Sequence, residues 1–205
     1  MLTATNLACH RGDRSLFTGV AFHLAAGSWL HVTGENGAGK TSLLRILCGL
    51  SPPAAGEICW RGVAIGKLDD EFRSDLLYLG HQTPVKEELT ARENLQISAA
   101  ASGIAQDGPE TMAALEQMGL RGREHLPVRF LSQGQKRRVA LARLLVSRAP
   151  LWILDEPFVA LDTPALAMLS GIIGSHLSRG GIAVLTSHQD VDIAAGERQT
   201  LRIAA

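Results

Sequence analysis

Hydrophobic positions along the chain recur at two spacings, one typical of strands and one typical of helices. Short apolar runs bounded by turn residues predict strands over 2–9, 15–24, 29–33, 57–60, 76–79, 151–154 and 182–186. Apolar positions three and four residues apart predict helices over 41–50, 90–101, 109–118, 133–146 and 164–177. Strands separated in this way by helices favour an α/β fold, in which helices cover both faces of a parallel sheet.

One stretch interrupts the alternation of strands and helices. It carries a helical pattern without an intervening strand, and Ser102 and Gly119 mark breaks within it. We therefore expect a single domain of 205 residues, divided into a core, 1–85 and 130–205, and an inserted helical subdomain, 86–129.

The composition is that of an ordinary globular protein. Hydrophobic residues make up 46% of the chain, and its 20 Lys and Arg residues balance its 20 Asp and Glu residues. Such a balance lacks the basic surface that nucleic-acid binding requires, so nucleic acid is not an expected partner. No apolar run reaches the roughly 18 residues of a membrane-spanning helix. Because the first residues also lack a secretory signal, we expect the chain to reside in the cytosol.

The cysteines indicate neither a disulfide framework nor a metal site. Cys9, Cys48 and Cys59 are odd in number, widely spaced and free of any C-x-x-C pattern. We expect all three to be buried, reduced thiols. Cys9 precedes His10 without the C-x-x-C-H pattern of heme attachment, so no heme site is expected on this chain.

The clearest chemical motif is a glycine-rich loop between a predicted strand and a predicted helix. It reads Gly34-Glu35-Asn36-Gly37-Ala38-Gly39-Lys40-Thr41 and matches G-x-x-x-x-G-K-[ST]. Glycines let backbone N–H groups curl around phosphates, and the helix N-terminus adds partial positive charge. Lys40 is expected to reach the β- and γ-phosphates of a nucleoside triphosphate, and the Thr41 hydroxyl to bind Mg²⁺.

Two adjacent acids end a later apolar strand. The run 151–154 is followed by Asp155 and Glu156, so a buried strand delivers two carboxylates at its C-terminal end. Asp155 is expected to hold Mg²⁺ through water, with Glu156 one residue further toward the γ-phosphate.

A third segment, Leu131-Ser132-Gln133-Gly134-Gln135, precedes a helix that begins with three basic residues. Ser132 is a favourable N-cap, and a helix start beside a glycine leaves N–H groups free to meet an anion. Read alone, the segment is a capped surface helix, and its local chemistry does not identify a function.

Together these motifs resemble the ATP-binding cassette ATPases that power membrane transporters. The resemblance covers essentially the whole chain and includes Gln82, similar to the family's Q-loop, the segment 160–162, similar to its D-loop, and Thr186-Ser187-His188 after a strand. It implies a P-loop fold with a mixed parallel core sheet of the RecA type, an N-terminal antiparallel β subdomain and an inserted helical subdomain.

The resemblance also implies roles for particular residues. Two copies would close head to tail around two ATP molecules, so that Ser132 and Gly134 of one copy cap the γ-phosphate held by Lys40 of the other. Glu156 would be the general base, Gln82 would sense the γ-phosphate through Mg²⁺ and water, and His188 would bridge the γ-phosphate and the neighbouring D-loop. The implied nucleotide-binding positions are Gly34, Glu35, Asn36, Gly37, Ala38, Gly39, Lys40, Thr41, Ser42, Ser132, Gly134 and Gln135; the implied Mg²⁺ positions are Thr41, Gln82 and Asp155.

The sequence departs from the family pattern in two places. Gln133 stands where many members have glycine, and its longer side chain is tolerated there if it points away from the nucleotide. Where the family stacks adenine on an aromatic residue, the segment 9–12 offers none, so either His10 or Arg11 supplies a planar face or the stacking is weak.

Finer resemblance points to the heme-exporter ATPases of bacterial cytochrome c maturation. It is carried by four segments, 77–82, 88–95, 135–144 and 151–158. It implies a homodimer bound to polytopic membrane subunits at the cytoplasmic face of the inner membrane, driving heme delivery or the release of a heme-loaded periplasmic chaperone. Exposed apolar residues near Leu89, Leu95 and Phe130 are then expected to dock the membrane partner.

Other functions remain open from the sequence alone. The chain is also compatible with the ATPase of another small exporter or with a soluble cassette acting as an assembly factor. A P-loop kinase would need no role for Ser132 and no dimer, and a nucleic-acid repair ATPase is disfavoured by the neutral charge balance.

Overall fold

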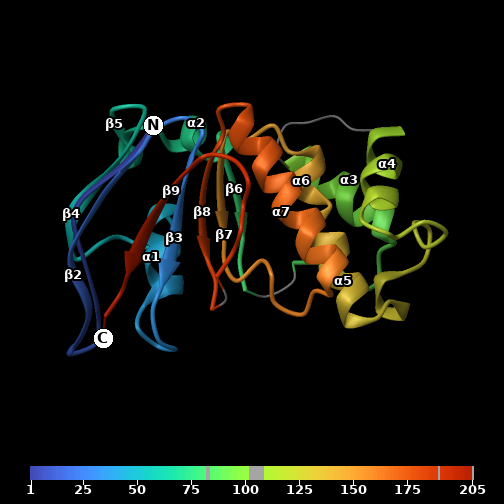
Figure 1. Cartoon of the computed structure of the whole chain (residues 1–205), viewed down its shortest axis with the longest axis horizontal. Coiled ribbons are helices and arrows are strands. Elements are labelled where there is room, and N and C mark those ends of the chain that lie inside the picture. The colour runs from blue at the N-terminus through green and yellow to red at the C-terminus, as the bar shows by residue number, and fades with distance from the viewer. Residues whose placement is uncertain (82–83, 102–108, 189, 205) are drawn as a thin grey trace.

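A computed structural model describes residues 1–81, 84–101, 109–188 and 190–204, and Gln82 therefore lies outside the described residues. Two sheets lie side by side with a helix between them, and most of the other helices lie on the far side of the second sheet (Figure 1). In the part of the chain that is described, no helix has the length and apolar character needed to cross a membrane.

The first sheet is antiparallel, with strand order β2-β1-β4-β5. Its strands are β1 (Leu2–Arg11), β2 (Arg14–Leu24), β4 (Ala55–Trp60) and β5 (Val63–Ala64). The pairing of β1 with β4 shifts register between Thr5 and Ala8. Gly56 sits opposite this irregularity at a φ of 87°, where an added Cβ would lie 2.4 Å from the carbonyl oxygens of Thr5 and Asn6. Only glycine fits so close a backbone approach.

The second sheet has strand order β6-β7-β8-β3-β9. Its strands are β3 (Ser28–Thr33), β6 (Leu76–Leu79), β7 (Leu151–Leu154), β8 (Ile182–Thr186) and β9 (Glu197–Arg202). Every residue of β7 and β8 is buried, as expected of central parallel strands covered on both faces. The expected mixed sheet is, among the described strands, parallel in all its pairs.

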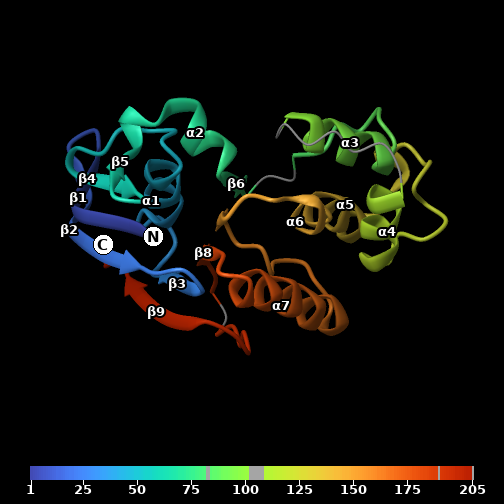
Figure 2. The ribbon, with the colours of Figure 1, turned by 90° about the horizontal axis from the view of Figure 1, so that it is seen from above.

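Helices fill the two spaces beside the parallel sheet. Helix α1 (Lys40–Leu47) lies between the two sheets, and α7 (Thr163–Ser178) covers the opposite face (Figure 2). Alternate residues divide β7 and β8 between two cores: Ile153 and Val184 belong to the core around α1, while Trp152 and Leu185 belong to the core around α7. This two-residue alternation fixes the register of the strands, because a slip by one residue would turn each side chain toward the opposite core.

Four further helices gather beyond α7 and the edge of the sheet (Figure 2). They are α3 (Ala91–Ala101), α4 (Pro109–Gln117), α5 (Gln133–Leu141) and α6 (Arg143–Val146). Thr90 and Glu93 exchange hydrogen bonds in a capping box that starts α3, since the Thr90 N–H donates to Glu93 at 2.8 Å and the Glu93 N–H donates to Thr90 at 3.1 Å. Leu95 is 1% exposed within the core, so its expected place on a docking surface is wrong, whereas Phe130 is 68% exposed.

Several elements differ from the sequence-based expectation. The helix expected over 133–146 is divided into α5 and α6 at Ala142. Helix α2 (Asp69–Ser74), the short helices Ile65–Lys67 and Val128–Phe130, and the strands β5 and β9 were not expected. Of the three cysteines, only Cys48 is buried, and Cys9 and Cys59 are partly exposed on the antiparallel sheet.

Candidate functional site

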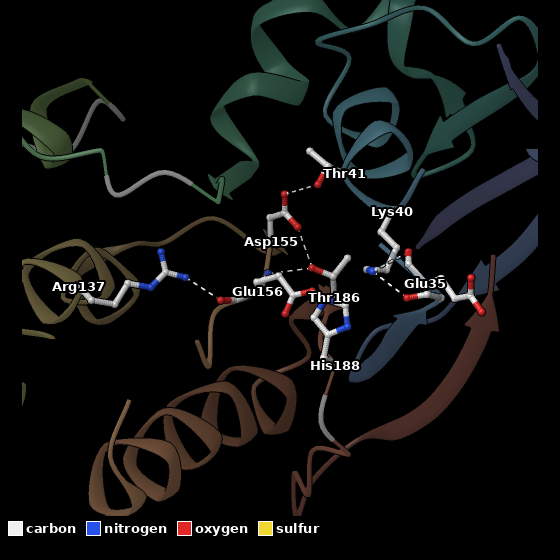
Figure 3. A network of polar contacts seen from close by, with 9 residues as sticks. Glu35, Lys40, Thr41, Arg137, Asp155, Glu156, Thr186 and His188 are labelled. Carbon is white, nitrogen blue, oxygen red and sulfur yellow. Dashed lines mark hydrogen bonds and ion pairs between the residues drawn. The ribbon is translucent and has the colours of Figure 1, made fainter. Parts of the chain in front are cut away.

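The glycine-rich loop leads from β3 into α1, which is the context the motif requires. Gly34 has a φ of 149°, and a Cβ there would lie 2.5 Å from the carbonyl oxygen of Ile203, so this position needs glycine. The Lys40 ammonium group donates to the carbonyl oxygens of Gly34 at 2.8 Å and Glu35 at 3.2 Å (Figure 3). The loop thus curls around the ammonium group at the N-terminus of α1, where partial positive charge favours an anion.

Asp155 joins the ends of two strands to this loop. Its carboxylate accepts one hydrogen bond from the Thr41 hydroxyl and one from the Thr186 hydroxyl, both at 2.8 Å (Figure 3). Asp155 follows β7 directly and is 1% exposed. Thr41 and Asp155, both expected at the Mg²⁺ position, are therefore in contact, and Thr186, which the sequence named only as part of the segment 186–188, is an additional partner.

Glu156 is held in an unusual backbone conformation beside Asp155. Its φ is 51°, in the left-handed region that non-glycine residues rarely adopt. The Glu156 N–H donates to the Thr186 hydroxyl at 2.8 Å, and its carbonyl oxygen accepts from the Arg137 guanidinium at 2.8 Å. Its carboxylate oxygen Oε1 lies 3.2 Å from Nε2 of His188, which is half exposed.

These residues surround one cavity of about 350 Å³. It is lined by Arg11, Leu16, Glu35, Asn36, Gly37, Gly39, Lys40, Thr41, Ser42, His81, Asp155, Glu156 and His188. The structure thus brings the loop, the two acids and His188 together around one cavity. The sequence left open whether His10 or Arg11 meets the nucleobase, and of these two only Arg11 lines the cavity. Leu16 and His81 also line the cavity, and neither was among the expected nucleotide-binding positions.

The cavity offers the oxygen ligands that Mg²⁺ prefers. The Thr41 hydroxyl and the Asp155 carboxylate face it together, and Mg²⁺ is commonly held by one or two such groups together with substrate phosphates. Within the described ranges, no three His, Cys, Asp or Glu side chains cluster closely enough to hold a metal without such help. The residues present therefore fit Mg²⁺ that is bound jointly with a phosphate chain.

The predicted anion-binding segment lies apart from this cavity. Ser132 is the N-cap of α5 and forms a capping box with Gln135: the Ser132 N–H donates to Gln135 Oε1 at 2.9 Å, and the Gln135 N–H donates to Ser132 Oγ at 3.3 Å. Neither these residues nor Gly134 line the cavity in the single chain. A role for them at the same nucleotide site requires a second copy.

Comparison with known proteins identifies the family. Residues 17–159 match the ABC transporter family model. The chain belongs to the ABC transporter family. A cytochrome c biogenesis ATP-binding export protein, CcmA, of Dechloromonas aromatica is 57% identical over 203 residues, which cover 99% of this chain and 100% of that protein. The protein of the same name from Escherichia coli K12 is 48% identical over 194 residues, covering 95% of this chain and 92% of that protein.

Solved structures of cassette proteins have the same fold. An ABC transporter ATP-binding protein from Pyrococcus furiosus matches with a TM-score of 0.85 and 26% identity, covering 98% of this chain and 96% of that one. A dimeric bacterial ABC transporter cassette matches with a TM-score of 0.83 and 25% identity, covering 98% and 94%. The predicted P-loop fold of the cassette type is confirmed, and the chain is an ATPase of a transport system.

Proposed function

We propose that this cassette ATPase is the ATP-hydrolysing subunit of the export system of bacterial cytochrome c maturation, and that its cycle drives heme delivery or the release of a heme-loaded periplasmic chaperone. The observation that carries the proposal is the 57% identity to a cytochrome c biogenesis export protein along that protein's whole length. The phosphate loop, Asp155, Glu156 and His188 around one cavity supply the chemistry that such a subunit needs.

In this proposal the chain binds MgATP and hydrolyses it with an activated water. The phosphate-loop amides and Lys40 hold the phosphates, while Thr41 and Asp155 hold Mg²⁺, which neutralises phosphate charge. Glu156 accepts the proton of the attacking water, because its buried Oε1 has no well-aligned hydrogen-bond donor among the described residues. His188 lies 3.2 Å from this oxygen, and its proposed role is to bridge the γ-phosphate and the D-loop of a second copy. Gln82, outside the described residues, keeps its proposed role as γ-phosphate sensor.

We further propose that two copies complete each site head to tail. The start of α5, with Ser132, Gly134 and Gln135, does not reach the cavity of its own chain, so the nucleotide of a second copy is its proposed partner. The dimeric bacterial cassette with a TM-score of 0.83 supports this assembly. Ser132→Arg is expected to abolish turnover while ATP still binds at Lys40.

Arg11 is the proposed platform for the nucleobase. It lines the cavity together with Leu16, whereas His10 does not. A guanidinium plane stacks on an aromatic ring by electrostatic attraction and surface contact. Arg11→Ala should weaken ATP binding several-fold with little change in kcat, as measured by nucleotide titration and steady-state hydrolysis; unchanged affinity would remove Arg11 from the base site.

The membrane partner is proposed to dock beside the helical part, 86–129. Phe130 is 68% exposed at the end of this segment, an unusual exposure for a phenylalanine. Polytopic membrane subunits would bury it and hold the chain at the cytoplasmic face of the inner membrane. In this arrangement the nucleotide-binding core consists of residues 1–85 and 130–205. The helical part transmits the movement of this core to the membrane partner.

Affinity purification from detergent-solubilised membranes tests the proposed function. The wild-type chain should co-purify with polytopic subunits required for c-type cytochromes, and Phe130→Asp should lose them while still binding ATP. Leu50→Asp is the matched control, because Leu50 is also an exposed apolar residue, at 55%, but follows α1. Recovery of an unrelated permease would overturn the cytochrome c assignment, and recovery of a soluble partner alone would favour an assembly factor.

A further inference from the structure

The strained backbone at Glu156 is held from both sides. A residue other than glycine at a φ of 51° is disfavoured by about 1–2 kcal/mol and persists only where its surroundings fix it. Two hydrogen bonds of 2.8 Å do so here: the N–H donates to Thr186 Oγ1, and the carbonyl oxygen accepts from Arg137 Nη2. Figure 3 shows Arg137 reaching the Glu156 backbone from the side opposite Lys40 and Thr41.

Among the residues that the structure describes, Arg137 makes one hydrogen bond, the bond to the Glu156 carbonyl. It comes from α5, is 8% exposed, and its Nε has no hydrogen-bond partner among the described residues. Burial lowers the pKa of the Arg137 guanidinium, and the nearby carboxylates of Asp155 and Glu156 oppose that shift. A buried guanidinium is costly unless it is paired and hydrogen-bonded, so the one directed bond that Arg137 makes within the described residues, to the Glu156 carbonyl, is a strong constraint.

We propose that Arg137 is a positioning residue for ATP hydrolysis: it fixes the Glu156 backbone so that the carboxylate stays at the cavity. The inference rests on the proposed role of Glu156 as general base. Without the bond from Arg137, the left-handed conformation loses its support on the carbonyl side. The carboxylate then leaves the position from which it can accept a proton, because a general base must lie within hydrogen-bond reach of the water it activates.

A double-mutant cycle between Arg137 and Glu156 tests the proposal. Arg137→Met removes the donor and keeps an unbranched side chain, and Arg137→Lys keeps the charge with a single ammonium group. Each substitution would be made alone and in combination with Glu156→Gln. For each protein, the hydrolysis of labelled ATP, the affinity for ATP and the thermal unfolding would be measured. Arg143→Met is the matched control, because Arg143 is another arginine whose pKa is lowered by burial, and it does not line the cavity.

The expected result is a loss confined to the chemical step. Arg137→Met should lower kcat by roughly tenfold or more, since a general base contributes about 10²–10⁴-fold to the rate of the chemical step. The affinity for ATP should change less than about threefold. In the Glu156→Gln background the same substitution should add no further loss, because the group it positions is gone. Arg137→Lys should fall between wild type and Arg137→Met, and Arg143→Met should keep the wild-type kcat.

Several outcomes would overturn the inference. A wild-type kcat for Arg137→Met, or an equal loss in both backgrounds, would show that Arg137 does not act through Glu156. If Arg137→Met fails to fold, Arg137→Lys decides, and a normal kcat for it overturns the proposal. Normal turnover of Glu156→Gln alone is a separate failure, since it would remove the proposed base itself.

Discussion

Thr186 shows how much of the site depends on one hydroxyl group. It donates to Asp155 and accepts from the Glu156 N–H, each at 2.8 Å, and the residue is completely buried. The two acids of the site are therefore oriented by the same side chain, which comes from the neighbouring strand β8. The sequence drew attention to this segment through His188 and gave no separate sign of Thr186, because its role depends on the pairing of β7 with β8.

Replacing Thr186 by valine should impair both stability and hydrolysis. Asp155 and the Glu156 N–H each lose a buried partner, which costs about 1–3 kcal/mol per group. We expect the free energy of unfolding in urea to fall by that order and kcat to fall with it. Thr111→Val is the control, because Thr111 is equally buried while its hydroxyl has no partner among the described residues. Equal effects of the two substitutions would contradict this account of Thr186.

His176 gives a prediction for pH dependence. Its ring stacks on Trp152 with centroids 3.7 Å apart, and one ring nitrogen lies 3.2 Å from the carbonyl oxygen of Ile182. Burial, the largest cause, lowers the pKa of His176 from 6.5 to about 4. The unfolded imidazole therefore takes up a proton at higher pH than the folded one. The stability contributed by His176 is present above pH 6.5 and is lost as the pH falls toward 4.

Unfolding in urea at two pH values measures this contribution. Between about pH 7 and about pH 5, the wild-type chain should lose about 2 kcal/mol more stability than His176→Phe, which keeps a ring against Trp152 but cannot be protonated. The same pH dependence in both proteins would mean that other groups cause the loss.

At the scale of elements, α5 connects three parts of the molecule. Its consecutive basic residues reach different partners: Lys136 pairs with Glu87, Arg137 donates to the Glu156 carbonyl, and Arg138 pairs with Asp162. Read alone, the segment that begins with the Ser132 cap indicated a surface helix, and two of its basic residues do not fit that reading, because Lys136 and Arg137 are each 8% exposed. Their partners are distant in sequence, so no local pattern could have revealed them.

Asp162 fixes both the start of α7 and its contact with α5. Its carboxylate accepts from the Ala165 N–H at 3.0 Å and pairs with Arg138 at 2.9 Å. Asp162→Ala should lower the free energy of unfolding by about 1–2 kcal/mol, most of it from the lost cap, and Asp162→Asn by less than about 1 kcal/mol, because Asn also caps. Asp70→Ala is the control, since Asp70 pairs with Arg73 on the surface without capping a helix. A loss as large for Asp70→Ala, measured by urea unfolding, would contradict the capping role.

The elements with strong apolar patterns were predicted well, and the others were not. Strands β3, β6, β7 and β8 lie within one residue of the expected ranges because each is rich in apolar residues, with His31 the one polar residue inside β3. Strand β9 was missed because, as an edge strand paired only with β3, it exposes polar residues that carry no strand signal. The break at Ala142 between α5 and α6 also has no sequence signal, since alanine favours helix.

At the scale of the whole molecule, the site lies where the strands of the parallel sheet end at their carboxyl side, as in other open α/β sheets. The phosphate loop follows β3, Asp155 and Glu156 follow β7, and His188 follows β8. The start of α5 lies elsewhere, and in a head-to-tail dimer it would meet the partner's nucleotide. The bond from Arg137 to Glu156 would then link the two nucleotide sites through a single helix.

Assembly on ATP is the most direct test of this account. Glu156→Gln should bind MgATP, hydrolyse it only at a slow residual rate, and change from one copy to two in light scattering when MgATP is added, because the proposed site is completed only by the second chain. Glu156→Gln combined with Ser132→Arg should bind MgATP and remain a single copy, with thermal unfolding showing that it is folded. A Glu156→Gln chain that binds MgATP and stays a single copy, or a Ser132→Arg combination that still pairs, would contradict the account.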